Sequence, residues 1–142
     1  MAWFRDIQAL QEPFDPGGTD EAGRAQCVFN VMATKRPSDT LVDELLKVLE
    51  TAGVGIRNVT LFGTSMAQTP RLRSVAEPDE AFLVVRPTGG PGPLGTHNDG
   101  AGAYRQPTAQ ILVRARTYPT AHAMAQRAFA ALVAVRNQAV AP

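Results

Sequence analysis

The chain has 142 residues, of which 44% are hydrophobic and 19% are charged, which is enough for one domain with a substantial core. Its 14 Lys and Arg against 13 Asp and Glu leave a net charge of +1, which is too balanced to indicate nucleic acid as the main partner. The single cysteine, Cys27, excludes an internal disulfide, and the lack of a long apolar run or a signal peptide predicts a protein of the reducing cytoplasm.

The N-terminal region, residues 1–36, predicts a hairpin-like pair of strands. Residues 3–10 fit a strand or a helix, and we favour the strand. Residues 27–34 alternate strictly, with Cys27 and every second residue after it forming one apolar face. The Pro- and Gly-rich residues 12–23 predict a broad turn between the two strands.

The first helix is predicted at residues 41–52, because its apolar residues recur three and four positions apart. Asp43 and Glu44 suit the positive end of the helix dipole, and Gly53 can end the helix in the left-handed conformation. The predicted buried face consists of Val42, Leu45, Leu46, Leu49 and Ala52.

A second, longer helix is predicted from Tyr118 to about Asn137, with Pro119 at its first turn. Its many alanines allow close approach to a sheet beneath it. The predicted inner face consists of Ala121, Met124, Ala125, Ala128, Leu132 and Val135, with Phe129 at its edge.

Three further strands are predicted between the helices, at residues 57–62, 81–85 and 108–116, with Gly63 and Pro87 ending the first two. The whole chain therefore predicts a single α+β domain, residues 1–142, in which two helices pack on a mixed or antiparallel sheet of four to five strands.

A long Gly/Pro-rich loop is predicted at residues 87–107. Unstructured insertions of this length are uncommon in compact domains and are typical of binding loops or disorder. We expect a contact arm that becomes ordered on assembly. In it Leu94 supplies an apolar anchor, Tyr104 an aromatic anchor and Arg105 a charge partner.

The sequence predicts no catalytic, cofactor or metal site, and we expect no enzyme. The glycines of residues 89–95 lack the Gly-Lys-Ser/Thr of a phosphate loop, and Pro91 and Pro93 remove backbone donors. His97 and His122, the only histidines, do not form a metal-binding or catalytic pattern with their sequence neighbours.

The middle of the chain is locally basic, which permits a nucleic-acid groove. We favour another interpretation, in which Arg114 and Arg116 line the polar face of the last strand and pair with carboxylates of a neighbour, forming a weaker part of the interface.

Three passages, residues 41–70, 81–90 and 104–132, resemble the tail terminators of long-tailed bacteriophages, also called tail-completion or minor head-tail joining proteins. The most distinctive is the last, in which Pro-Thr-Ala-Gln-Ile-Leu-Val-Arg-Ala leads through Tyr118 into the long helix. The resemblance covers about residues 39–135.

The resemblance implies a structural virion protein, assembled in the host cytoplasm. It would be a subunit of a homo-oligomeric ring, usually a hexamer, located at the head-tail junction. Its partners would be the tail tube protein and the head-tail connector or adaptor proteins. DNA would pass through the ring without sequence-specific binding, and no cofactor is implied.

One feature departs from the family pattern. In the family a final hairpin follows the long helix, whereas here residues 20–31 look like that hairpin placed at the front. Either the order of the segments is permuted relative to the family, or the front segment is an unrelated extension. In the second case the C-terminal hairpin is lost and the edge of the sheet is more exposed. Two functional alternatives stay open: a head-tail adaptor or tail-tube subunit, and, ranked below it, a small hydrolase or nucleotide-binding protein with the loop as a lid.

Overall fold

The computed structural model describes residues 2–17, 25–36, 41–57, 59–63, 81–90 and 105–140. Within these ranges the elements are β1 (Ala2–Ala9), β2 (Ala25–Lys35), α1 (Leu41–Thr51), β3 (Leu61–Phe62), β4 (Phe82–Gly89), β5 (Thr108–Ala115), α3 (Tyr118–Val133) and β6 (Arg136–Val140). The predicted α+β class with two helices on a mixed sheet is confirmed, but the described sheet has six strands instead of four or five.

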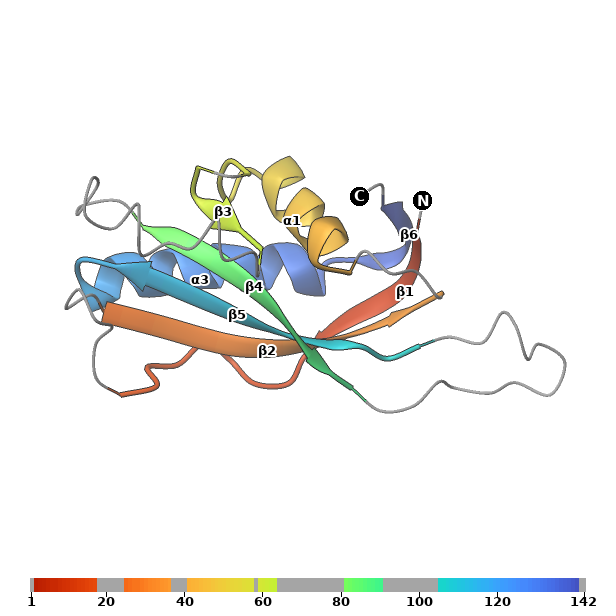
Figure 1. Cartoon of the computed structure of the whole chain (residues 1–142), viewed down its shortest axis with the longest axis horizontal. Helices are drawn as coiled ribbons and strands as arrows, with labels where there is room; N and C mark the ends of the chain where they lie inside the picture. The colour runs from red at the N-terminus through yellow and green to blue at the C-terminus, as the bar shows by residue number, and fades with distance from the viewer. Residues whose placement is uncertain are drawn as a thin grey trace, which may run out of the picture.

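The strands form one curled sheet in the order β3-β4-β5-β2-β1-β6. Every neighbouring pair is antiparallel except β3 and β4, which are parallel. Both helices pack on one face of this sheet, α3 across β1, β2 and β5, and α1 against β3, β4 and β6 (Figure 1). The main core therefore lies between one sheet face and the helices.

The two central strands follow the predicted alternation. In β2, Cys27, Phe29 and Val31 are at most 1% exposed and face α3, where the Phe29 ring meets that of Phe129 at 5.7 Å. In β5, Ile111 lies opposite Phe29 and is equally buried. The expected strand in residues 3–10 is also present as β1, next to β2.

The helices bury the predicted faces with two differences. Leu45 and Leu49 are fully buried, and Gly53 ends α1 at a φ of +78°, where residues with a side chain are strained. Glu44, however, is buried in the interior instead of lying at the exposed helix end, and Ala52 is exposed. In α3 the buried residues are Ala121, Met124, Ala125, Ala128 and Leu132.

The prediction that the long helix continues to about Asn137 is wrong. The helix ends at Val133, and β6 begins at Arg136. Asn137 has a φ of +44°, which an α-helix cannot accommodate, and β6 pairs with β1, for example Ala139 with Trp3. Pairing with a strand more than a hundred residues away thus overrides the local helical spacing.

The predicted strand at residues 57–62 is reduced to Leu61–Phe62. Before it the chain forms a tight turn, in which the Ile56 carbonyl accepts bonds from the amides of Val59, Thr60 and Leu61. These local bonds satisfy backbone groups that a longer strand would have used.

The prediction that Pro87 ends its strand is also wrong, because β4 continues to Gly89. Pro87 is tolerated because the β4–β5 register shifts between Pro87 and Gly89, and such irregularities accept a residue without an N–H. Gly90, at a φ of +129°, lies so close to the Gln106 carbonyl that a Cβ atom would clash with it. Within the predicted loop 87–107, residues 87–89 are therefore part of β4 and Arg105 bridges to Lys35, while residues 91–104 lie outside the described residues.

Candidate interaction surfaces

The base of the predicted contact arm is a regular strand pair. The first half of β4 is buried, whereas residues 86–89 are exposed although they still pair with β5. The hydroxyls of Thr88 and Thr108 lie 2.7 Å apart across this pair. The pair leads away from the helices toward one end of the described sheet (Figure 1). Leu94 and Tyr104, the predicted anchors, lie outside the described residues.

Arg105 is held by the sheet at its backbone, while its side chain is exposed. Its N–H donates to the Lys35 carbonyl at 2.7 Å, and its carbonyl accepts from the Lys35 N–H at 3.0 Å. The cation predicted as a charge partner is therefore displayed from a fixed position at the base of the arm.

The two strand arginines do not join Arg105 in one patch. Arg114 is half-buried in β5, opposite Phe82 of β4 and Gln26 of β2, and Arg116 follows β5 as an exposed residue. Nine residues of extended chain separate Arg114 from Arg105, or roughly 30 Å at a strand rise of about 3.3 Å. Both Arg114 and Arg116 already interact within the chain.

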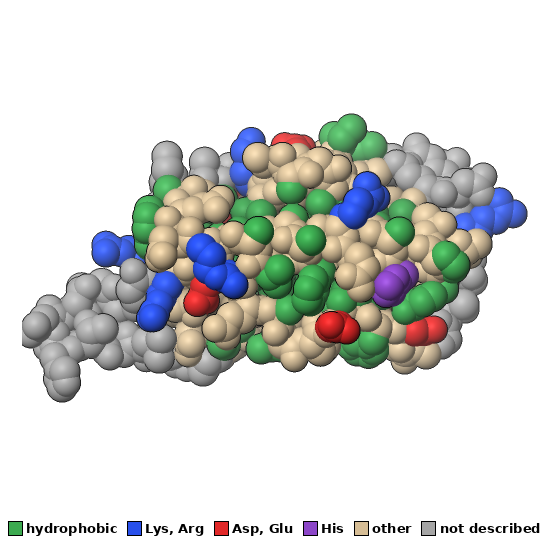
Figure 2. Space-filling view, turned by 180° about the vertical axis from the view of Figure 1, so that it is seen from behind, with side chains coloured by type: hydrophobic (Ala, Val, Ile, Leu, Met, Phe, Trp, Pro, Cys, Tyr) green, Lys and Arg blue, Asp and Glu red, His purple; other side chains and the backbone are tan. Residues whose placement is uncertain are grey.

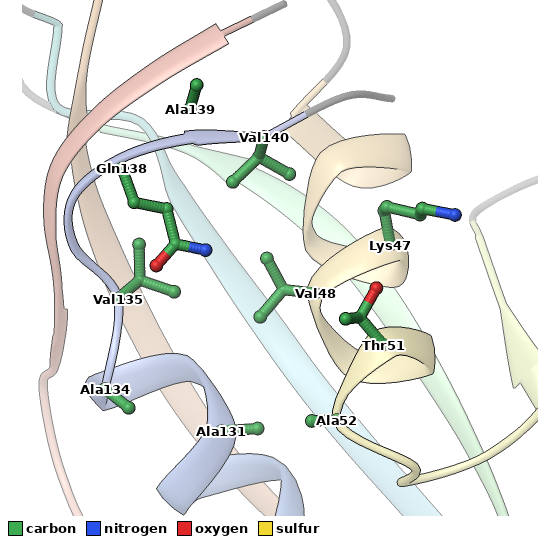
Figure 3. Close-up of a pocket in the computed structure, with 10 residues that line it drawn as sticks. All are labelled: Lys47, Val48, Thr51, Ala52, Ala131, Ala134, Val135, Gln138, Ala139 and Val140. Atoms are coloured by element: carbon green, nitrogen blue, oxygen red, sulfur yellow. The ribbon is translucent and has the colours of Figure 1, made fainter.

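A groove of about 350 Å³ lies between α1, the C-terminal end of α3 and β6 (Figure 3). Val48, Val135 and Val140 point into it and form an apolar floor, each of them at most 9% exposed. Lys47 and Gln138 are exposed members of the lining. The full lining is Lys47, Val48, Thr51, Ala52, Ala131, Ala134, Val135, Gln138, Ala139 and Val140.

Sequence reasoning missed this groove because it assigned part of β6 to the helix. Ala52 was expected on the buried helix face, yet it is exposed and lines the groove, whereas Val135 is buried as expected and forms part of the floor. Arg136, on β6, pairs with Asp6 of β1 and lies outside the lining. Its guanidinium donates to the carbonyls of Val135 at 2.8 Å and Ile7 at 3.4 Å. The groove thus combines an apolar floor with one exposed cation, Lys47, in its lining.

The N-terminal turn, residues 10–17, presents apolar and acidic side chains together. Leu10 is 52% exposed and Phe14 is 43% exposed, and the acidic Glu12 and Asp15 are exposed beside them. The backbone is nevertheless fixed, because Phe14 exchanges two hydrogen bonds of 2.9 Å with Val28. Exposed apolar residues on a fixed backbone are typical of a contact surface.

Two polar pairs lie in or next to the core. Lys35 and Glu44 form a buried ion pair, in which the Nζ and Oε2 atoms lie 2.8 Å apart. Burial raises the pKa of the Cys27 thiol above its ordinary value, an effect that hydrogen bonding with Tyr118 partly opposes. A protonated, buried thiol is a poor nucleophile, so Cys27 contributes packing at neutral pH.

Within the described residues, no group of three or more His, Cys, Asp and Glu is placed to hold a metal ion. In the same part of the chain, no helix has the length and apolarity to cross a membrane. Comparison of the chain with protein families, with curated proteins and with solved structures finds no match.

Proposed function

We propose that the chain is a structural protein of a bacteriophage virion: a subunit of a ring, hexameric by analogy with tail terminators, that caps the tail tube and joins it to the head connector. The resemblance of residues 39–135 to that family supports the proposal. The protein acts by association, and DNA passes through the ring without being read.

The observation that carries the proposal is the projecting strand pair. Residues 86–89 of β4 are exposed while still paired with β5, and β3 ends opposite Val84, so this stretch of β4 is an uncovered edge of the described sheet. An exposed strand end gains no stability from burial or from a covering helix. Its uncovered backbone and side chains are available for contact with a partner. A projection of this kind suits a subunit that reaches a neighbour or the tube below it.

The fold also has the asymmetry that a ring requires. A closed ring is built from two different, complementary patches on each subunit. The two edge strands of the described sheet differ in this way: β3 has two residues and runs parallel to β4, whereas β6 has five and runs antiparallel to β1. The ends of the subunit therefore present different surfaces.

Native mass spectrometry and sedimentation velocity test the proposal, on the purified chain and on the chain mixed with tail tubes. We expect a cyclic oligomer with the mass of six chains, either in the purified chain alone or once tail tubes are added. A chain that stays monomeric in both samples and never joins a particle contradicts the proposal.

The alternative with the same assembly role, an adaptor or tube subunit, differs only in position. A density map of the assembled particle distinguishes them: a single ring between tube and connector supports the terminator. A stack of repeated rings, or a layer within the connector, supports the alternative.

A further inference from the structure

We infer that the groove formed by α1, α3 and β6 receives the N-terminal turn, residues 10–17, of a second copy of this chain, in a head-to-tail contact. This inference rests on the proposed ring, because it names the pair of surfaces that closes it. The contact matches the exposed apolar side chains of the turn to the apolar floor of the groove, and its acidic side chains to Lys47 in the groove lining.

The two surfaces lie at opposite ends of α3. The turn lies near its first residue, since Phe14 bridges to Val28 of β2, next to Cys27, and the Cys27 thiol is a hydrogen-bond partner of Tyr118. The groove lies at the other end, where Ala131 and Ala134 line it. The 16 residues of α3 span roughly 24 Å at 1.5 Å per residue, so the turn of one copy does not reach its own groove.

The apolar parts match in size and character. Phe14, 43% exposed, presents an aromatic ring on a fixed backbone, and Leu10, 52% exposed, stands beside it. The groove volume of about 350 Å³ is at the lower end of the roughly 300–1,000 Å³ of small-ligand pockets, which accommodates a phenyl ring. An aromatic anchor in an apolar groove is the typical centre of a protein interface.

The charges match as well. The turn contributes the exposed carboxylates of Glu12 and Asp15, and the groove lining contributes the exposed cation Lys47. Figure 2 shows one face of the molecule, on which basic side chains lie at the top and on both sides, and acidic ones lie at the top, along the lower edge and beside basic ones at the left. Opposite charges around an apolar centre fix the orientation of the partner.

When two copies form one such contact, one of them keeps an unused turn and the other keeps an unused groove. Such a heterologous contact continues from copy to copy until it closes on itself as a ring. The inferred pair of surfaces therefore accounts for a closed assembly in a way that a two-fold contact does not.

Cross-linking tests the contact directly, because Cys27 is fully buried and reacts slowly. One full-length variant carries Pro16→Cys in the turn, and another carries Thr51→Cys at the groove; both residues are exposed. A short bis-maleimide should join the two variants when they are mixed, and neither variant to itself. Cross-links within either single variant, or none in the mixture, overturn the inference.

A charge swap tests the same contact in solution. We expect Lys47→Glu or Glu12→Lys alone to weaken assembly about ten-fold or more, because each places like charges together. The double variant should return to within about three-fold of the wild-type association constant. Arg5→Glu and Ile56→Ser are the matched controls, since both residues are exposed and outside the two surfaces, and both should assemble normally.

The outcomes separate this inference from the proposed ring. If the wild type forms rings while the cross-links are absent and the charge variants assemble normally, the ring stands and this contact is wrong. If the wild type is monomeric with and without tubes, both are wrong. If the groove variants lose binding to tube or connector proteins but keep the ring, the groove docks a different partner and the inference is overturned.

Discussion

The Nζ atom of Lys35 lies 2.8 Å from the Oε2 atom of Glu44, and the two side chains are only 1% and 0% exposed. Lys35 is the last residue of β2, and Glu44 lies in the first turn of α1. The same Nζ lies 5.3 Å from the centre of the Phe4 ring. The ion pair therefore joins the end of a central strand to the start of a helix, inside the core.

Replacing one partner of this ion pair should destabilise the fold more than replacing both partners. Lys35→Met leaves the Glu44 carboxylate buried without its cation, which costs about 3–5 kcal/mol. The double variant Lys35→Met/Glu44→Leu replaces both charges by apolar groups and should be close to wild type or more stable. Urea unfolding of the three proteins measures this, and a double variant less stable than Lys35→Met contradicts it.

The apolar face of α1 should be essential to stability. Leu45 and Leu49 are fully buried, so changing either to Ala should cost about 2–5 kcal/mol through lost burial and the cavity left behind. Ile56, which is 61% exposed, serves as the control, and Ile56→Ala should change the free energy of unfolding by less than about 0.5 kcal/mol. If the free energy of unfolding falls by less than about 0.5 kcal/mol at both leucines, the buried face of α1 is wrongly assigned.

The buried thiol of Cys27 should make stability depend on alkaline pH. Because burial raises its folded-state pKa above the ordinary value of a thiol, the protonated thiol favours the folded state. That contribution is complete below the pKa of the thiol in the unfolded chain and is lost as the pH rises through the folded-state pKa. The stability advantage of wild type over Cys27→Ala should therefore shrink at alkaline pH, as followed by urea unfolding at several pH values. A difference that stays constant through this range contradicts the assignment.

Deleting residues 1–36 should abolish soluble folding. The deletion removes both β1 and β2, so β5 loses its β2 partner, β6 loses its β1 partner, and Phe29 and Val31 are lost from the core. Removing the two strands leaves β5 and β6 with unpaired edges. Expression and circular dichroism test this, and a stable truncated protein that assembles would show the segment to be accessory.

Shortening the arm should affect assembly and leave the fold intact. Replacing residues 92–102, which lie outside the described residues, with a short Gly-Ser link keeps the strand pair that ends at Gly89 and Thr108. We expect the melting temperature of the isolated chain to change little, while its association with neighbours or tubes weakens. Normal completion of tails by the shortened protein would show that the arm is a tolerated insertion.

Several elements were predictable because their pattern is local. The alternation after Cys27 and the spacing of Leu45, Leu46 and Leu49 each identify an element and its buried face without reference to the rest of the chain. The groove was not predictable in this way. Its wall is β6, whose five residues, Arg-Asn-Gln-Ala-Val, have neither helical nor strand periodicity of their own.

Side-chain periodicity, which is set by the geometry of each element, was enough to predict the α+β class, the two helices and the buried faces of the central strands. The end of α3, the length of β4 and the carboxylate that lies beside Lys35 could be read only from the folded chain. Those features depend on pairing between β6 and β1, on a register shift opposite β5 and on burial of Glu44 against β2. Each is a contact between segments far apart in the chain, and local propensity gives way to such contacts when they satisfy backbone groups or buried charges.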